Sequence, residues 1–186
     1  MEKTVLKKYL RPILVLPACF LFLIQTAFGQ LHPVAKESSV KFSLRNFGFK
    51  TGGTLAAPEG DIIFNPDELA KSSFKVTIKT ESINTDNESR DEHLREEGYF
   101  NVKNYPLIRF VSDNVRTSGK KGEYEVSGAL TIKNKTKAIV IPFTAEKSGD
   151  GWLFTGSFNM NRRDFDIGGS STISNELTVD IKVAAH

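Results

Sequence analysis

Histidine, cysteine and serine side chains carry most metal and nucleophilic chemistry, and this sequence spaces them for neither. The histidines are His32, His93 and His186, and no two of them have the spacing of metal ligands. The single cysteine, Cys19, lies in the apolar N-terminal stretch. The chain contains neither a Gly-x-Ser-x-Gly sequence nor a Cys–His pairing. These residues therefore predict no metal site, no cofactor and no nucleophilic catalysis of these kinds.

Charged residues cluster between positions 90 and 95, where Arg90, Asp91, His93 and Arg95 occur together. On a helix, Asp91 and His93 are two residues apart and lie on different faces, so they do not form a catalytic pair. We expect these residues to fix a helix to the rest of the domain, with Arg90, Asp91 and Arg95 forming ion pairs. A ligand or partner contact is the alternative.

Two glycine pairs, Gly52-Gly53 and Gly168-Gly169, could suggest phosphate-binding loops. Neither pair has the Gly-Lys-Ser/Thr ending or the strand–helix context of such a loop. We interpret both as flexible or positive-φ loop positions.

The first 29 residues are typical of a secretory signal peptide. Basic residues precede an apolar stretch from Pro12 to Ile24, and Ala27-Phe28-Gly29 fits the small-x-small cleavage pattern. We predict cleavage before Gln30, which leaves residues 30–186 as one domain in the periplasm or outside the cell. A retained anchor is the first alternative, although the stretch is shorter than the ~20 residues of a spanning helix. Lipidation of Cys19 is the second.

Cleavage changes the charge balance of the chain. The whole sequence has 25 basic and 22 acidic residues, whereas residues 30–186 have 21 of each. The basicity thus belongs mostly to the predicted signal, and bulk charge does not predict nucleic-acid binding.

Beyond residue 38, apolar residues alternate with polar ones, which is typical of strands with one apolar face. Eight strands are expected, at 40–44, 60–64, 74–78, 108–110, 123–132, 137–145, 152–159 and 177–183. Short connections between the last four require antiparallel neighbours. The fold class is therefore all-β, and the sheet closes into a barrel or pairs into a sandwich. Gly128 and Gly156 interrupt apolar faces, where glycine permits bending or leaves space for a ligand.

One segment breaks the two-residue period after the third predicted strand. Thr85 and Glu88 fit a capping box, with Thr85 as N-cap. We expect a short helix over 89–97 that ends at Gly98, and a further helical turn within 66–72.

Several motifs in the same order resemble the YceI-like family of polyisoprenoid-binding, or lipid-binding, periplasmic proteins. The motifs are Ser38–Leu44, Glu81–Thr85 with Arg90–Leu94, Tyr105–Phe110 with Ser112, Gly128–Ile132 and Asn161–Ile167. The resemblance spans residues 38–183. The chain departs from the family pattern at Asn46, where histidine is frequent, at Gly52-Gly53, where a basic residue is frequent, and at Asp166, where glycine is usual.

The resemblance implies a lipocalin-like antiparallel barrel, to which the strand and helix patterns give eight strands and one short helix after the third strand. It also implies a periplasmic protein whose long cavity holds an isoprenoid chain or another amphiphilic lipid, rather than an enzyme. The expected tail contacts are the inward-facing Phe42, Leu44, Phe110, Val126, Leu130, Trp152, Phe154 and Phe158. Phe165 is expected at the mouth. Asn161 and Arg162 either meet a polar head or hold a loop by hydrogen bonds.

Two other functions remain open from the sequence. An interaction or accessory module would have a filled barrel core, because an interior of about eight strands is either just filled or just wide enough for one ligand. An enzyme acting on a hydrophobic substrate would need a titratable group buried among the aromatic residues. A homodimer through an exposed strand edge is also possible.

Overall fold

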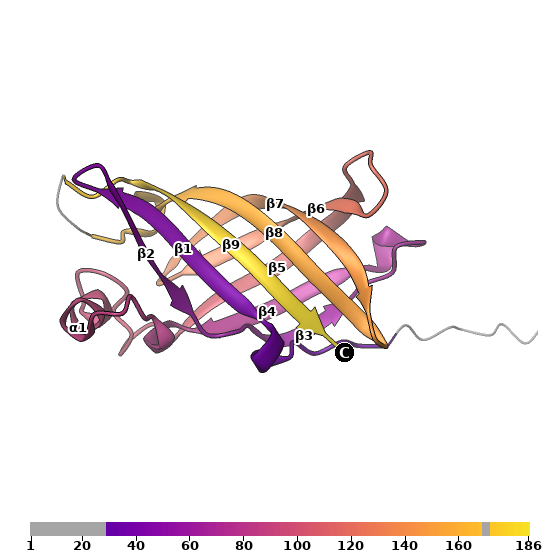
Figure 1. The fold of residues 1–186 in the computed structure, drawn as a ribbon, viewed down its shortest axis with the longest axis horizontal. Helices are drawn as coiled ribbons and strands as arrows, with labels where there is room; N and C mark the ends of the chain where they lie inside the picture. Colours follow the sequence, from indigo (N-terminus) through magenta and orange to yellow (C-terminus); the bar gives the residue numbers. More distant parts are fainter. Residues whose placement is uncertain (1–28, 169–171) are drawn as a thin grey trace, which may run out of the picture.

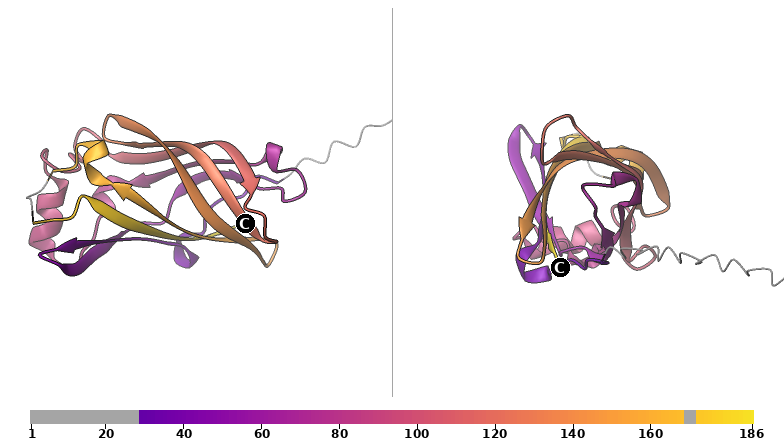
Figure 2. Two further views of the ribbon diagram at one scale, coloured as in Figure 1. Left: turned by 90° about the horizontal axis from the view of Figure 1, so that it is seen from above. Right: turned by 90° about the vertical axis from the view of Figure 1, so that its right-hand side faces the viewer.

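Nine antiparallel strands form one sheet that curls around the long axis of the molecule (Figures 1 and 2). The structure is a computed structural model that describes residues 29–168 and 172–186. Residues 1–28 of the predicted signal peptide, and Gly169, lie outside the described residues. The strands are β1 (Ser39–Asn46), β2 (Phe49–Leu55), β3 (Glu59–Ile63), β4 (Ser73–Lys79), β5 (Leu107–Thr117), β6 (Glu123–Ile132), β7 (Lys135–Ser148), β8 (Gly151–Asn161) and β9 (Glu176–Ala185).

Short helical elements connect some of these strands. The α-helix is α1 (Glu88–Arg95), and the 3₁₀ turns are η1 (Ala35–Glu37), η2 (Leu69–Lys71), η3 (Thr80–Ser82) and η4 (Arg162–Phe165). The strand order is β2-β1-β9-β8-β7-β6-β5-β4-β3. Consecutive strands therefore pair with each other, except β2 and β3, which lie at the two ends of the order, and β9 pairs with β1 as well as with β8.

The predicted count of eight strands was wrong, because β2 was missed. Gly52 and Gly53 were interpreted as loop positions, but both belong to β2, opposite Ser43 and Phe42 of β1. Glycine is needed there for close approach rather than for a turn. A Cβ on Gly53 would lie 2.4 Å from the backbone oxygen of Asn84. With β2 counted, α1 follows the fourth strand.

Strands β2 and β3 end the sheet order, and other segments bridge the space between them. At one end, Thr54 of β2 exchanges backbone hydrogen bonds with Asn84, at 2.8 and 3.0 Å. At the other end, Leu31 exchanges hydrogen bonds with Ile62 of β3, at 2.7 and 2.9 Å.

The same N-terminal segment also continues along β9. His32 and Val34 donate backbone hydrogen bonds to His186 and Ala184, each at 2.8 Å. Residues 31–34 therefore link β3 to the end of β9. They satisfy backbone groups that would otherwise form an exposed sheet edge.

The predicted alternation of apolar and polar faces is confirmed in β6, where Val126, Gly128, Leu130 and Ile132 are buried. Gly128 lies beside a β-bulge between Ser112 and Asn114 of β5, and a Cβ on it would lie 2.4 Å from the oxygen of Val111. The glycine therefore permits a tight approach of β6 to β5.

The predicted helix is present, but its cap differs from the expectation. The N-cap is Asn87, whose side chain accepts a hydrogen bond from the backbone nitrogen of Arg90 at 2.9 Å. Thr85 instead bonds to Asp91. The helix ends at Arg95 rather than at Glu97. The helical turn expected within 66–72 is η2.

An aromatic cluster fills the interior at one end of the barrel. Phe64 lies at its centre, and its ring centroid is 5.0 Å from that of Trp152, 5.2 Å from that of Tyr124 and 5.3 Å from that of Phe154. These pairs are close to perpendicular, which is a favourable aromatic geometry. The cluster blocks this end, so open interior space lies toward the end that carries α1 and the β1–β2 hairpin (Figure 1).

Candidate functional site

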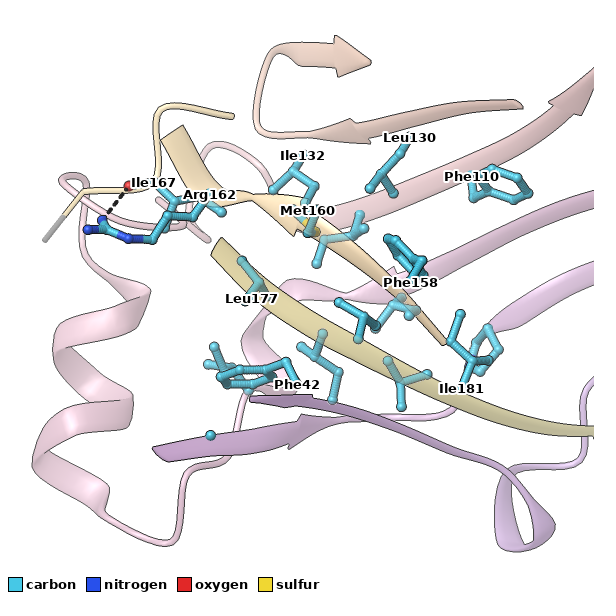
Figure 3. Close-up of a pocket in the computed structure, with 18 of the residues that line it drawn as sticks. Phe42, Phe110, Leu130, Ile132, Phe158, Met160, Arg162, Ile167, Leu177 and Ile181 are labelled. Carbon is cyan, nitrogen blue, oxygen red and sulfur yellow. Dashed lines mark hydrogen bonds between the residues drawn. The ribbon is translucent and has the colours of Figure 1, made fainter. Parts of the chain in front are cut away.

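The barrel interior contains a cavity of about 300 Å³ with an almost wholly apolar wall. Phe42, Leu130, Phe158 and Ile181 point into it from four different strands (Figure 3). The volume is at the lower end of the range for small-molecule sites, about 300–1,000 Å³. It has room for about ten groups the size of a water molecule.

Polar residues gather at one end of the cavity, between the β1–β2 hairpin, α1 and η4. The polar side chains in the wall are those of Asn46, Thr51, Thr85, Arg90, Tyr99 and Arg162. The opposite end is bounded by Phe74, Phe143 and Phe154 of the aromatic cluster. The cavity is thus amphipathic along its length, apolar at the end beside the aromatic cluster and polar at the end beside α1.

Asn46 supplies an unused hydrogen-bond acceptor at the polar end. Its Oδ1 atom is buried and has no hydrogen-bond partner within the described part of the chain. Asn46 also lines the cavity. Buried polar atoms are nearly always paired, so an unpaired acceptor in a cavity wall is a candidate contact for a ligand donor.

Arg162 is buried and binds the loop that follows η4. Its guanidinium donates to the backbone oxygens of Ser174, Ile167 and Ile173 at 3.0, 3.0 and 3.1 Å, and also to that of Gly168. Burial lowers the pKa of Arg162, the charge of Arg163 lowers it further, and Tyr99 acts in the opposite direction. The geometry therefore corresponds to the loop-holding alternative, at a position that still lines the cavity.

The helix α1 is held over the polar end by hydrogen bonds centred on Thr85. The Thr85 hydroxyl donates to Asp91 at 2.5 Å and accepts from Nε of Arg90 at 2.8 Å. Arg95 donates to the backbone oxygens of Glu81 and Ile83, each at 3.1 Å. The predicted fixing of the helix is present, but hydrogen bonds to Thr85 and to backbone oxygens provide it instead of the expected ion pairs.

His93 has only local contacts. Its ring nitrogens lie 3.0 Å from Oε2 of Glu96 and 3.1 Å from the hydroxyl of Tyr99. Both neighbours lie just beyond it in sequence, and His93 does not line the cavity. It therefore helps to order the chain after α1.

The cavity brings together most of the residues expected to contact a ligand. It is lined by Phe42, Leu44, Phe110, Val126, Leu130, Phe154, Phe158 and Arg162. Trp152 is not in the wall, because it packs on Phe64 at the closed end with Lys147 over its ring. Phe165, 1% exposed, packs in the core and not at a mouth. Asn161 accepts a hydrogen bond from the Arg163 backbone and donates one to Glu176.

Further residues line the cavity that were not named as ligand contacts. They include Val76, Ile78, Ile83, Leu94, Phe100, Ile139, Leu177, Val179 and Ile181. Val76, Ile78, Leu177, Val179 and Ile181 belong to the same two-residue periods that identified the others, so parity was a sufficient signal for them. Ile139 lies in a strand that is apolar on both faces, where parity does not separate inward from outward side chains. Leu94 and Phe100 come from α1 and the loop after it, where strand parity gives no information.

No carboxylate or histidine is among the described residues of the cavity wall. Within residues 29–168 and 172–186, no three metal-binding side chains lie close enough together to hold an ion. In the same ranges, none of the helices has the length and apolar character needed to cross a membrane.

Comparison with known proteins identifies relatives over nearly the whole domain. The model of a family described as the YceI-like domain matches residues 32–185. A UPF0312 protein of Pseudomonas savastanoi is 33% identical over an alignment of 153 residues that covers 78% of this chain and 79% of that protein. A UPF0312 protein of Vibrio cholerae is 27% identical over an alignment of 194 positions that covers 97% of this chain and 98% of that protein.

Solved structures share the fold. Burkholderia cenocepacia BcnA has a TM-score of 0.78 at 24% identity and covers 83% of this chain and 99% of its own. A polyisoprenoid binding domain from Saccharophagus degradans has a TM-score of 0.68 at 13% identity, with coverage of 84% and 97%. The YCEI protein of Campylobacter jejuni has a TM-score of 0.63 at 27% identity, with coverage of 71% and 82%.

Proposed function

Because the chain belongs to the YceI-like family, we propose that it is an exported carrier that binds the apolar tail of an isoprenoid or similar amphiphilic lipid inside its barrel. The observation that carries the proposal is the cavity, which is apolar along its length and polar only beside α1 and the β1–β2 hairpin. The resemblance of the fold to a polyisoprenoid binding domain supports the same class of ligand.

The size of the cavity sets the length of tail that it holds. About ten methylene-sized groups fit, and each contributes about 0.8 kcal/mol on burial, or about 8 kcal/mol in all. That free energy corresponds to roughly micromolar affinity before the costs of association are subtracted. A longer tail must either displace part of the Phe64 cluster or leave its remainder at the polar end.

The polar end favours a head group that donates a hydrogen bond. Oδ1 of Asn46 is available as an acceptor. The charged groups of Arg90 and Arg162 are directed largely to Thr85 and to the carbonyls of the loop after η4. A hydroxyl head on an isoprenoid tail therefore fits this end.

The first test is native mass spectrometry of protein prepared from the periplasm without detergent. We expect an adduct that disappears after extraction with organic solvent. The second test is displacement of the apolar dye N-phenyl-1-naphthylamine by primary alcohols of increasing chain length. The affinity should rise about fourfold for each carbon added to the alcohol and should stop rising at about ten carbons.

Two results would contradict the carrier. A filled-core interaction module predicts neither an adduct nor dye binding. An enzyme on a hydrophobic substrate predicts turnover of a bound alcohol that is lost in His93→Ala or Arg162→Ala. Export is tested separately, by N-terminal sequencing of the protein from the periplasm, with Gln30 expected as its first residue.

A further inference from the structure

Two exposed phenylalanines form the tip of the β1–β2 hairpin, at the same end of the barrel as α1 (Figure 1). Phe47 is 72% exposed and Phe49 is 79% exposed. The other exposed large hydrophobic residues in the described chain, Val111 and Val140, lie on strands β5 and β7. Two exposed aromatic side chains at the tip of a hairpin need an explanation, whereas single exposed valines on a sheet do not.

The backbone of the tip makes Phe47 a costly choice for local structure. The turn residues are Phe47 and Gly48, with φ values of +48° and +83°. Asparagine or glycine is favoured at the first of two such positions, and a bulky side chain with positive φ is an outlier. Neither packing against the residues that the structure describes nor turn geometry therefore accounts for Phe47, so its side chain indicates a contact outside the fold.

The flanking charges indicate the kind of contact. Arg45 and Lys50, directly opposite each other on the two strands, are both exposed. Nη1 of Arg45 donates to the backbone oxygen of Gly48 at 2.9 Å, which holds this cation at the tip. Aromatic side chains beside cations match the boundary between lipid tails and anionic headgroups.

The size of the patch argues against a second protein. Two phenylalanine side chains offer at most about 500 Å² of surface. A stable protein interface needs about 800 Å² from each partner. A bilayer has no such minimum, because each inserted side chain is buried independently of the others.

The tip is also continuous with the polar end of the cavity. Asn46 directly precedes Phe47, and Asn46, Thr51 and Gly52 line the cavity. In Figures 1 and 2, α1 lies at the same end but apart from the tip. Its exposed Glu88 and Glu92 would be repelled by anionic lipid, so the hairpin side is the side that approaches.

We propose that Phe47 and Phe49, flanked by Arg45 and Lys50, insert into an anionic lipid bilayer and place the polar end of the cavity against the membrane. This inference rests on the proposed lipid ligand for its purpose, but the membrane contact itself is tested without any ligand.

The experiment is co-sedimentation of the protein, residues 30–186, with vesicles of equal parts phosphatidylcholine and phosphatidylglycerol. Binding to these vesicles should weaken when salt is added. Binding to vesicles of phosphatidylcholine alone should also be weaker. The variant Phe47→Asn places the preferred Asn-Gly pair in the turn, so it should fold as stably as the parent or more so. Combined with Phe49→Thr, it should bind vesicles at least about a hundredfold more weakly, about tenfold for each phenylalanine.

Controls separate this proposal from its alternatives. Val111→Thr and Val140→Thr remove exposed apolar groups elsewhere and should leave vesicle binding unchanged. Dye binding in solution should survive the double variant. The proposal is overturned if the parent does not bind anionic vesicles or if the double variant binds them equally well. It is also overturned if the phenylalanines instead maintain a dimer in light scattering. If the parent bound vesicles but did not bind the dye, the proposed lipid ligand would be contradicted and the membrane contact would still be supported.

Discussion

Ile181 of β9 lies directly across from Gly156 of β8, and both line the cavity. Ile181 therefore faces the cavity from its wall, opposite a residue that has no side chain. Ile181→Trp should therefore fill the cavity from its wall with a modest cost in stability, up to about 3 kcal/mol from overpacking. We expect dye and alcohol binding to fall by at least about tenfold, measured by fluorescence titration.

The neighbouring residue Lys182 provides the matched control for this prediction. It is exposed and has the opposite parity on β9. Lys182→Trp adds the same indole to the outer face and should leave affinity unchanged. Equal affinity of the Ile181→Trp protein and its parent would show that the ligand binds elsewhere.

Asn46 should discriminate between ligands that donate a hydrogen bond and ligands that do not. In the parent, a ten-carbon alcohol should bind about two- to tenfold more tightly than the hydrocarbon of equal length, since one hydrogen bond contributes about 0.5–1.5 kcal/mol. In Asn46→Leu the preference should vanish, while hydrocarbon affinity is kept. Competition titration measures both values, and an undiminished preference in the variant would assign the head group to another residue.

Arg162 should contribute to stability through its shape as well as its charge. The variant Arg162→Lys keeps a cation but cannot reach the carbonyls of Ser174, Ile167 and Ile173 together. We expect a loss of about 2–4 kcal/mol in the free energy of unfolding, because buried carbonyls lose their donors. Urea denaturation measures the loss, and the exposed neighbour Arg163, changed to lysine, should lose less than about 1 kcal/mol.

Asp91 should be needed to keep α1 in place. It is 7% exposed and accepts from both the backbone nitrogen and the hydroxyl of Thr85, at 2.9 and 2.5 Å. Asp91→Ala leaves two buried donors unpaired and should cost about 2–4 kcal/mol. The same change at the exposed Glu92 of α1 should cost less than about 0.5 kcal/mol. If hydrogen exchange at α1 were identical in the two variants, the helix would be held by other contacts.

Gly53 should be intolerant of any side chain. A Cβ there would lie 2.4 Å from the Asn84 oxygen and 2.9 Å from both Phe42 and Thr85 side-chain atoms. Gly53→Ala should therefore separate β2 from residues 84–85, with a loss of about 1–3 kcal/mol. Gly98→Ala, where a Cβ meets nothing within 4 Å, is the control for the substitution. A Gly53→Ala protein as stable as the parent would show that β2 and residues 84–85 can accommodate an added methyl group.

The sequence predicted the strands whose apolar residues alternate without interruption, because burial of one face imposes that period. The segment Phe49–Leu55 carries no such period, and its two glycines resemble a turn. Their role depends on close contacts with Phe42 and Asn84, which belong to other segments of the chain. Close approach between segments is a tertiary property, and local patterns do not report it.

The cavity was only partly predictable for a similar reason. Parity separates inward from outward side chains, but it does not say how far along the barrel the interior is filled. Trp152 has the same parity as Phe154 and Phe158, yet it packs beyond the cavity against Phe64. At Asp166, where the resemblance led us to expect glycine, φ is +52°, a left-handed conformation that glycine adopts without strain.

Residues 31–34, which hydrogen-bond to β3 and to the end of β9, also determine at which end of the barrel the protein can be attached to a support. Leu31, close to the predicted cleavage site, is paired with Ile62 of β3. The N-terminal segment enters the barrel at the end remote from the β1–β2 hairpin (Figure 1). Any tag, linker or sensor-chip attachment fused ahead of Gln30 therefore starts from the aromatic end. A protein immobilised in this way presents its hairpin outward, which suits it to flow-cell measurements with vesicles.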